Sequence, residues 1–144
     1  MTKYVVGFAF DQRETMVALM LKARPNWQRG FLNGIGGHVE PDEISDPMAA
    51  MDREWDEETQ GSDAVQWTLF AKITGDKFEV YFYRGNSDKL AELESGSEGE
   101  EIVVCAIDEL PENVISNLRW LLPMARTRSA HDWPYSILEK AVIE

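Results

Sequence analysis

The sequence is poor in cysteine, in basic residues and in long apolar runs. Its one cysteine, Cys105, cannot form an intramolecular disulfide and suits a reducing compartment. Against 14 Lys and Arg stand 26 Asp and Glu, giving a formal charge of −12, so we expect neither a nucleic-acid polymer nor an anionic membrane as partner. The apolar run at 3–10 is too short for a signal peptide or a membrane span. These features predict a soluble, cytoplasmic protein.

The rest of the composition is that of a globular protein. The chain has 144 residues, of which 44% are hydrophobic and 28% charged, enough to bury a core within one domain spanning 1–144. Cys105 lies in the apolar run IVVCAI and is expected to be a small core residue rather than a nucleophile.

Apolar runs and turn residues divide the chain into short elements. We expect strands at 3–10, 15–23, 65–74, 77–85 and 102–108, the third and fourth of which form a hairpin. The Gly-, Pro- and Asn-rich segment 24–43 indicates a structured loop, and the acidic segment 87–101 indicates a loop that is mobile in part. The tail from residue 133 fits either a strand or a helix.

Two helices are predicted among these strands. The first covers 46–59, with Asp46 as N-cap before Pro47, an apolar stripe of Met48, Met51 and Trp55, and Gly61 just beyond its end. The second follows residue 109 and is interrupted by Pro123. Helices combined with a mixed set of strands predict an α+β fold of the α/β/α sandwich type.

The first helix carries three glutamates on one face. Glu54, Glu57 and Glu58 are related by three and four positions, which places their Cβ atoms about 5–6 Å apart. Like charges at this spacing repel, and the helix dipole disfavours anions near the C-terminal end. A solvated acidic face is the ordinary interpretation of such a helix. Clustered carboxylates are also the ligands that hard divalent cations prefer.

This arrangement resembles the Nudix (MutT-type) hydrolase family. The family motif is a Gly, five residues, a Glu, seven residues and then Arg-Glu-apolar-any-Glu-Glu-any-Gly. The present chain has Gly37, then Glu43 after five residues, and Arg53-Glu54-Trp55-Asp56-Glu57-Glu58. Nine residues rather than seven separate Glu43 from Arg53, and Gly61 comes one place late, with Gln60 in its usual position. The longer spacing leaves open whether Glu43 reaches Arg53.

The resemblance implies a fold, a chemistry and a set of site residues. The fold is the Nudix α/β/α sandwich with a mixed sheet, and a homodimer is common in the family. The chemistry is Mg²⁺- or Mn²⁺-dependent hydrolysis of a nucleoside diphosphate linked to another group. Arg53, Glu43, Glu54 and Glu57 are the expected catalytic residues, with Glu54 as first choice for the base. The expected metal ligands are Gly36, Gly37, Glu54, Glu57, Glu58 and, from a distal loop, Glu101, with Glu98 and Glu100 as further candidates.

The loop ahead of the motif is similar to that of the oxidised-purine nucleoside triphosphatases in the family, in which an aromatic residue lies six positions before an Asn. Trp27 and Asn33 occupy these positions. An indole can stack on a base and an amide can read its edge, although Trp27 also fits a core or lid residue and Asn33 an ordinary turn. The segment 117–125 resembles the one lining the base pocket in that subgroup, which adds Asn117 and Trp120.

Lys22 and Arg24 lie near the same loop and could meet phosphates, although exposed basic side chains often have no such role. The expected substrate is a (deoxy)nucleoside triphosphate, cleaved to a monophosphate and pyrophosphate. The alternatives are a dinucleotide or nucleotide-sugar pyrophosphatase and a Nudix-fold module that binds a nucleotide without hydrolysing it. Neither the base nor the phosphorus that is attacked follows from the sequence.

Overall fold

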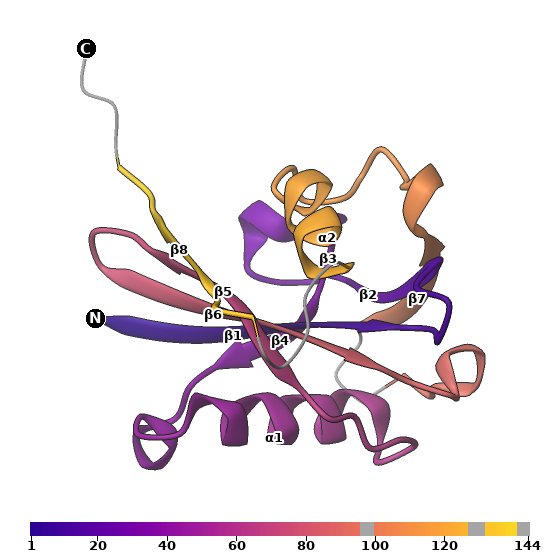
Figure 1. The fold of residues 1–144 in the computed structure, drawn as a ribbon, viewed down its shortest axis with the longest axis horizontal. Helices are drawn as coiled ribbons and strands as arrows, with labels where there is room; N and C mark the ends of the chain where they lie inside the picture. Colours follow the sequence, from indigo (N-terminus) through magenta and orange to yellow (C-terminus); the bar gives the residue numbers. More distant parts are fainter. Residues whose placement is uncertain (96–99, 127–131, 141–144) are drawn as a thin grey trace.

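A computed structural model describes residues 1–95, 100–126 and 132–140 of the chain. A mixed sheet runs through the centre, with helix α1 (Pro47–Thr59) on one face and helix α2 (Leu118–Arg126) on the other (Figure 1). The α/β/α sandwich predicted from the sequence is therefore confirmed. Among the described residues, no helix is both long and apolar enough to cross a membrane.

The sheet contains parallel and antiparallel pairs. Its strands are β1 (Thr2–Phe10), β2 (Met16–Leu21), β3 (Leu32–Asn33), β4 (Ile35–His38), β5 (Thr68–Thr74), β6 (Phe78–Asn86), β7 (Glu101–Ala106) and β8 (Tyr135–Leu138). The main order is β3-β2-β1-β6-β5-β8, while β4 pairs with β1 and β7 with β2. The β1–β6 and β5–β8 pairs are parallel. The β5–β6 pair is the antiparallel hairpin that the sequence predicts.

Strand β1 shows how the sequence builds a core on both faces of the sheet. Alternate side chains of a strand point to opposite faces, so Phe8 joins the buried cluster that contains α2 residues, while Val5 joins the cluster that contains α1 residues. On the α1 face, Gly7 leaves room for the helix: a Cβ at this position would lie 2.6 Å from Cε of Met51. Helix α1 can therefore pack directly on the centre of β1.

Helix α1 begins at Pro47, as predicted, but two details differ. Asp46 precedes the helix without a side-chain capping hydrogen bond. Met48 is 38% exposed, and the buried positions are Ala50, Met51, Trp55 and Thr59. The apolar stripe is thus shifted around the helix, so that Ala50 rather than Met48 packs in the α1-side core.

Two other predictions require correction, and the structure decides one point that the sequence left open. The expected loop 24–43 contains β3 and β4, because the backbones of Gly36 and Gly37 pair with Val6 and Val5 of β1 and a backbone ladder needs no side chains. Helix α2 continues through Pro123 instead of being interrupted there, since buried Leu121 and Leu122 before it and buried Ala125 after it anchor the helix to the core. The tail, which the sequence left undecided, forms strand β8 along the edge of β5.

The other elements are short. The 3₁₀ turns are η1 (Asn26–Gln28), η2 (Pro41–Glu43), η3 (Leu90–Glu92) and η4 (Ile107–Glu109). Turn η3 lies in the acidic segment expected to be a loop, and Leu90 anchors it in the α1-side core. Cys105 is buried as predicted, and burial raises the pKa of its thiol.

Candidate active site

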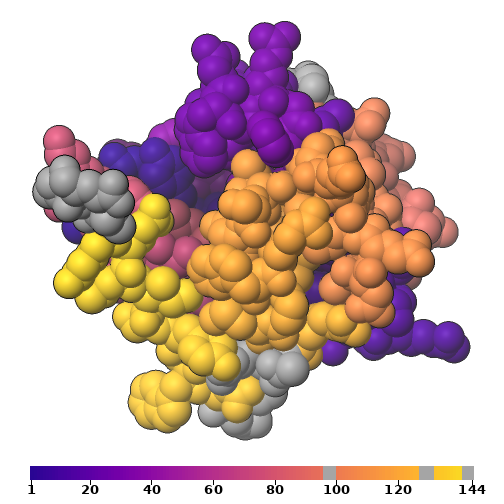
Figure 2. Space-filling view, turned by 90° about the horizontal axis from the view of Figure 1, so that it is seen from above, coloured from indigo at the N-terminus to yellow at the C-terminus, as the bar shows by residue number. Residues whose placement is uncertain are grey.

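A cleft of about 1430 Å³ opens on the molecule between α1, the loop before β3, the start of α2 and the tail strand β8. In Figure 2 the recess lies between the purple loop, the orange α2 segment and the yellow tail. Its volume exceeds the roughly 300–1,000 Å³ of ordinary small-molecule sites. One end is lined by acidic residues of α1 and the other by aromatic and amide side chains.

Arg53 organises the acidic end. Its guanidinium donates two hydrogen bonds to Glu43, from Nε to Oε2 at 2.8 Å and from Nη2 to Oε1 at 3.0 Å. It also donates to the backbone carbonyl of His38 at 3.0 Å and to Glu54 Oε1 at 3.0 Å. The two extra residues before the helix therefore do not separate Glu43 from Arg53, because turn η2 returns Glu43 to the helix.

The same ion pair sets the charge state of its members. Hydrogen bonding from Arg53 lowers the pKa of Glu43, and Glu43 in turn raises the pKa of Arg53. Both groups are thus charged throughout the physiological range. Arg53 is held as a fixed cation between turn η2 and the acidic face of α1.

Glu54 is much more enclosed than Glu57 on the same helix face. Its side chain is 13% exposed and lies against Gly37, where a Cβ would come within 2.5 Å of Glu54 Oε1. Burial raises the pKa of Glu54, while neighbouring Arg53 opposes the shift. A buried carboxylate of this kind is stabilised by additional positive charge, so this position fits a divalent cation with oxygen ligands.

Glu57 and Glu58 line the cleft beside Glu54, with the Glu57 side chain 58% exposed. Within the described ranges, the acidic trio whose oxygens lie within 4.8 Å of one another is Glu40, Asp42 and Glu43 instead. That trio has a structural explanation, because Glu40 and Glu43 cap turn η2 and Glu43 binds Arg53.

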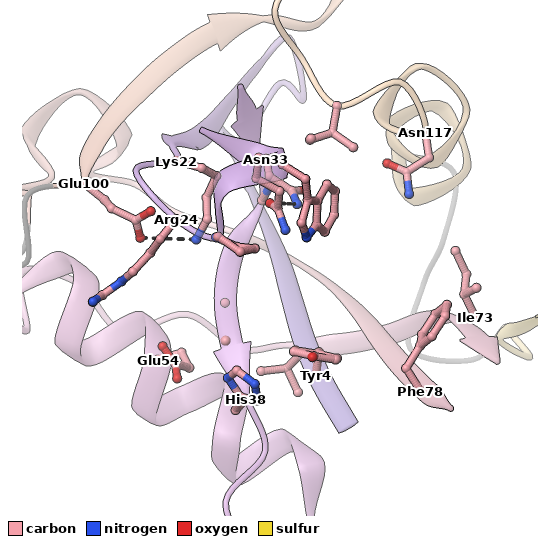
Figure 3. Close-up of a pocket in the computed structure, with 18 of the residues that line it drawn as sticks. Tyr4, Lys22, Arg24, Asn33, His38, Glu54, Ile73, Phe78, Glu100 and Asn117 are labelled. Carbon is pink, nitrogen blue, oxygen red and sulfur yellow. Dashed lines mark hydrogen bonds and ion pairs between the residues drawn. The ribbon is translucent and has the colours of Figure 1, made fainter. Parts of the chain in front are cut away.

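The distal acid in the cleft is Glu100, whereas the sequence favoured Glu101. Glu101 is the first residue of β7, and its side chain is exposed. Because successive side chains of an extended chain point to opposite faces, the preceding residue, Glu100, points to the other face. Glu100 is 7% exposed and lines the cleft, accepting hydrogen bonds from Lys22 Nζ at 3.2 Å and from the backbone N–H of Ala23 at 2.8 Å. Figure 3 shows Glu100, Arg24 and Glu54 on the same side of the cavity. Glu98 lies outside the described residues.

The other end of the cleft carries the expected base-binding residues. Trp27 is 69% exposed and Trp120 is 44% exposed, and both line the cleft, so neither is a core residue. Asn33 and Asn117 lie on two walls of the same cavity (Figure 3). Lys22 and Arg24 also line the cleft.

Several lining residues were not found from the sequence. Tyr4 and His38 face each other with ring centroids 4.6 Å apart, and Gln28 lies beside Asn33. Tyr4 could have been suspected from the alternation of β1. The contribution of Ile137 and Leu138 could not, because it depends on the pairing of β8 with β5.

Comparison with known proteins agrees with this geometry. A family model of the NUDIX domain matches residues 2–125, so the chain belongs to that family. It is accordingly a Nudix hydrolase, a class of enzyme that cleaves nucleoside diphosphates linked to another group. No match was found among curated proteins.

Solved structures share the fold at low identity. A MutT structure from work on Aliivibrio salmonicida and Vibrio cholerae is 21% identical, covering 88% of this chain and 98% of that one, with a TM-score of 0.63. A MutT NUDIX hydrolase from Burkholderia pseudomallei is 17% identical, covering 85% and 96%, with a TM-score of 0.69. A NUDIX hydrolase from Nitrosomonas europaea is also 17% identical, covering 96% and 79%, with a TM-score of 0.70.

Proposed function

We propose that the chain hydrolyses a (deoxy)nucleoside triphosphate to the monophosphate and pyrophosphate in a reaction that depends on Mg²⁺ or Mn²⁺. The observation that carries this proposal is the continuity of the cleft, which joins the acidic face of α1 to the exposed indoles of Trp27 and Trp120. A nucleotide needs both environments, because its phosphates require cations and its base requires an apolar face.

The metal-binding end would use oxygen ligands only. Glu54, Glu57 and Glu58 would hold the cation, together with the backbone carbonyl of Gly36 or Gly37 and with Glu100 in place of Glu101. A bound divalent cation neutralises phosphate oxygens and lowers the pKa of a coordinated water. The oxygen-only donor set matches the preference of Mg²⁺ and Mn²⁺.

The protein groups then have distinct roles. A water oxygen attacks one phosphorus, the bond between that phosphorus and the bridging oxygen breaks, and Glu54 accepts the proton of the water. Arg53 keeps the Glu54 carboxylate in place through the 3.0 Å hydrogen bond, and Glu43 fixes Arg53. Because Gly37 has no side chain, the Glu54 carboxylate can lie against the cleft wall there, from which it would face the phosphates of a bound nucleotide.

At the other end, Trp27 and Trp120 would stack on the base, Asn117 would contact its edge, and Asn33 would act on that edge through its hydrogen-bond partner Gln28. Arg24 would meet the phosphates, and Lys22 would do so from its present position beside Glu100. These assignments place every expected substrate-binding residue along one path through the cleft.

A dinucleotide or nucleotide-sugar substrate is a second candidate, and one observation favours it. The cleft is also lined by the apolar and aromatic side chains of Tyr4, Ile73, Phe78 and Leu138, which could receive a second group. A module that only binds nucleotides is the alternative from another class.

The decisive test is phosphate and pyrophosphate release with Mg²⁺ across a panel of mononucleotides, dinucleotides and nucleotide sugars. We expect turnover of nucleoside triphosphates, and we expect Glu57→Gln to reduce kcat by at least about 100-fold. Asp56→Asn is the matched control, since Asp56 is exposed on α1 and is not among the residues that line the cleft. Binding of a nucleotide without metal-dependent turnover of any substrate would instead identify a binding module.

Metal binding has its own readout. Millimolar Mg²⁺ or Mn²⁺ should raise the melting temperature of the wild type, because a ligand that binds only the folded state stabilises it. Glu57→Gln or Glu58→Gln should abolish the rise, and Asp56→Asn should retain it. An equal rise in all four proteins would place the metal elsewhere.

A further inference from the structure

A chain of hydrogen bonds fixes the orientation of the Gln28 side-chain amide in the cleft. The backbone N–H of Gly34 can only donate, and it donates to Asn33 Oδ1 at 2.8 Å. The Asn33 amide is thereby oriented, and its Nδ2 donates to Gln28 Oε1 at 3.0 Å. Because the oxygen of Gln28 is turned towards Asn33, its Nε2 must lie on the other side of the planar amide.

The backbone around Gln28 is held as firmly as its side chain. Its N–H donates to the carbonyl of Pro25 at 2.9 Å, and its own carbonyl accepts from the N–H of Phe31 at 2.9 Å. Gln28 lines the cleft, and within the described part of the chain no acceptor for Nε2 is found. Gln28 therefore presents two N–H donors to a molecule bound in the cleft.

Asn117, on another wall of the cleft, has a side-chain acceptor without a hydrogen-bond partner. It immediately precedes α2, a position where Asn commonly caps the helix, yet its Oδ1 is buried without a hydrogen-bond partner. An unpaired buried acceptor is costly unless a ligand satisfies it. Figure 3 shows Asn33, the partner of Gln28, and Asn117 on different sides of the cavity.

We propose that Gln28 is a specificity-determining residue, which through its Nε2 donor selects nucleotides whose base carries a ring carbonyl over those that carry an amino group in its place. Asn33 is a positioning residue that acts through Gln28. A carbonyl accepts a hydrogen bond from one N–H of Gln28, whereas an amino group leaves a donor facing a donor. The inference rests on the proposed nucleotide function and assigns its base selectivity to one side chain.

The geometry makes a sharp prediction for two different substitutions. Gln28→Glu keeps an acceptor for Asn33 and turns a carboxylate oxygen to the cleft, which replaces the donor by an acceptor. Asn33→Asp keeps the acceptor for Gly34 but removes the donor to Gln28, so the Gln28 amide turns over and exposes its Oε1. Both variants should therefore shift the preference towards an amino group, although one of them leaves Gln28 unchanged.

The assay uses two nucleotides that have the same 2-amino group but a carbonyl or an amino group at position 6 (with the accompanying change at N1), guanosine triphosphate and 2,6-diaminopurine riboside triphosphate. We expect the wild type to have a kcat/KM ratio of about 10 or more in favour of the carbonyl base, and Gln28→Glu and Asn33→Asp to lower this ratio by about 10- to 100-fold. Gln28→Ala should bring the ratio near one, and so should the double variant Gln28→Ala with Asn33→Asp. Gln66→Glu makes the same charge change at an exposed residue that does not line the cleft and should leave the ratio as in the wild type.

Dissociation constants of the two corresponding monophosphates, measured without metal, separate this inference from the proposed function. A shifted ratio of affinities without turnover would support the role of Gln28 and refute the hydrolase reaction. Normal turnover with the same ratio in the wild type and Gln28→Glu would refute the role of Gln28 alone. Failure of both monophosphates to bind would overturn the selection of the base by Gln28. A reversal of the base preference in Gln28→Glu but not in Asn33→Asp would overturn the orientation of Gln28 by Asn33.

Discussion

The ion pair between Glu43 and Arg53 allows a quantitative test of how turn η2 is fastened to α1. The side chains of Glu43 and Arg53 are 10% and 25% exposed, and two hydrogen bonds at 2.8 and 3.0 Å join them. Hydrogen bonds to charged groups are worth about 1.5–3 kcal/mol each, and solvent screening on the Arg53 side reduces this figure. Because Gln retains one acceptor, we expect Glu43→Gln to lower the free energy of unfolding by about 1–2 kcal/mol.

This loss should appear in the melting temperature and depend on pH. For a chain of this size it corresponds to a decrease of roughly 3–8 °C. Arg53 lowers the pKa of Glu43 from its ordinary value of 4.5, so the pair stabilises the fold fully above the unfolded-state pKa and loses its effect as the pH falls through the folded-state pKa. The gap between wild type and Glu43→Gln should thus be constant from about pH 6 to 8 and narrow below about pH 4.

Thermal and urea unfolding without divalent metal would measure this gap. Glu109→Gln, which removes an exposed glutamate on turn η4, is the matched control and should unfold like the wild type. Equal stability of Glu43→Gln and wild type at pH 7 would show that the ion pair contributes nothing. A gap that persists undiminished to pH 3 would show that the loss has a cause other than the charge of Glu43.

Two further predictions concern the cleft itself. Gly37→Ala should reduce kcat by about 10-fold or more, with a much smaller effect on stability. The reason is that the added Cβ would lie 2.5 Å from Glu54 Oε1 and would displace the carboxylate. Unchanged kinetics would mean that Glu54 has no fixed position in the reaction. Trp27→Ala should raise KM by about 5- to 50-fold with a smaller change in kcat. The exposed indole can contribute to binding of the base but has no role in the chemistry. A fall in kcat without a rise in KM would contradict a stacking role.

The sequence predicted the fold well where local signals were strong. Pro47 marked the start of α1, alternating aromatic residues marked β6, and the spacing of Glu54, Glu57 and Glu58 placed all three on the side of α1 that faces the cleft. These features depend on neighbours in the chain. They can be read without knowledge of the tertiary contacts.

Features that depend on distant contacts could not be predicted in the same way. Strand β4 is rich in glycine and has no strand pattern of its own, but β1 supplies its partner. Whether Glu100 or Glu101 lines the cleft depends on the residue at which β7 begins. The neighbouring sequence does not determine that starting residue. The orientation of Gln28 requires the N–H of Gly34 and the amide of Asn33 to be seen together.

Strand β8 has a practical consequence for work on this protein. The family match ends at residue 125, yet Ile137 and Leu138 belong to the cleft wall and are carried by a strand that pairs with β5. A chain trimmed to the limits of the match would keep Arg53 and the α1 glutamates but open the pocket on its apolar side. Recombinant versions that end at residue 125 would then accept a broader range of substrates than versions that keep β8.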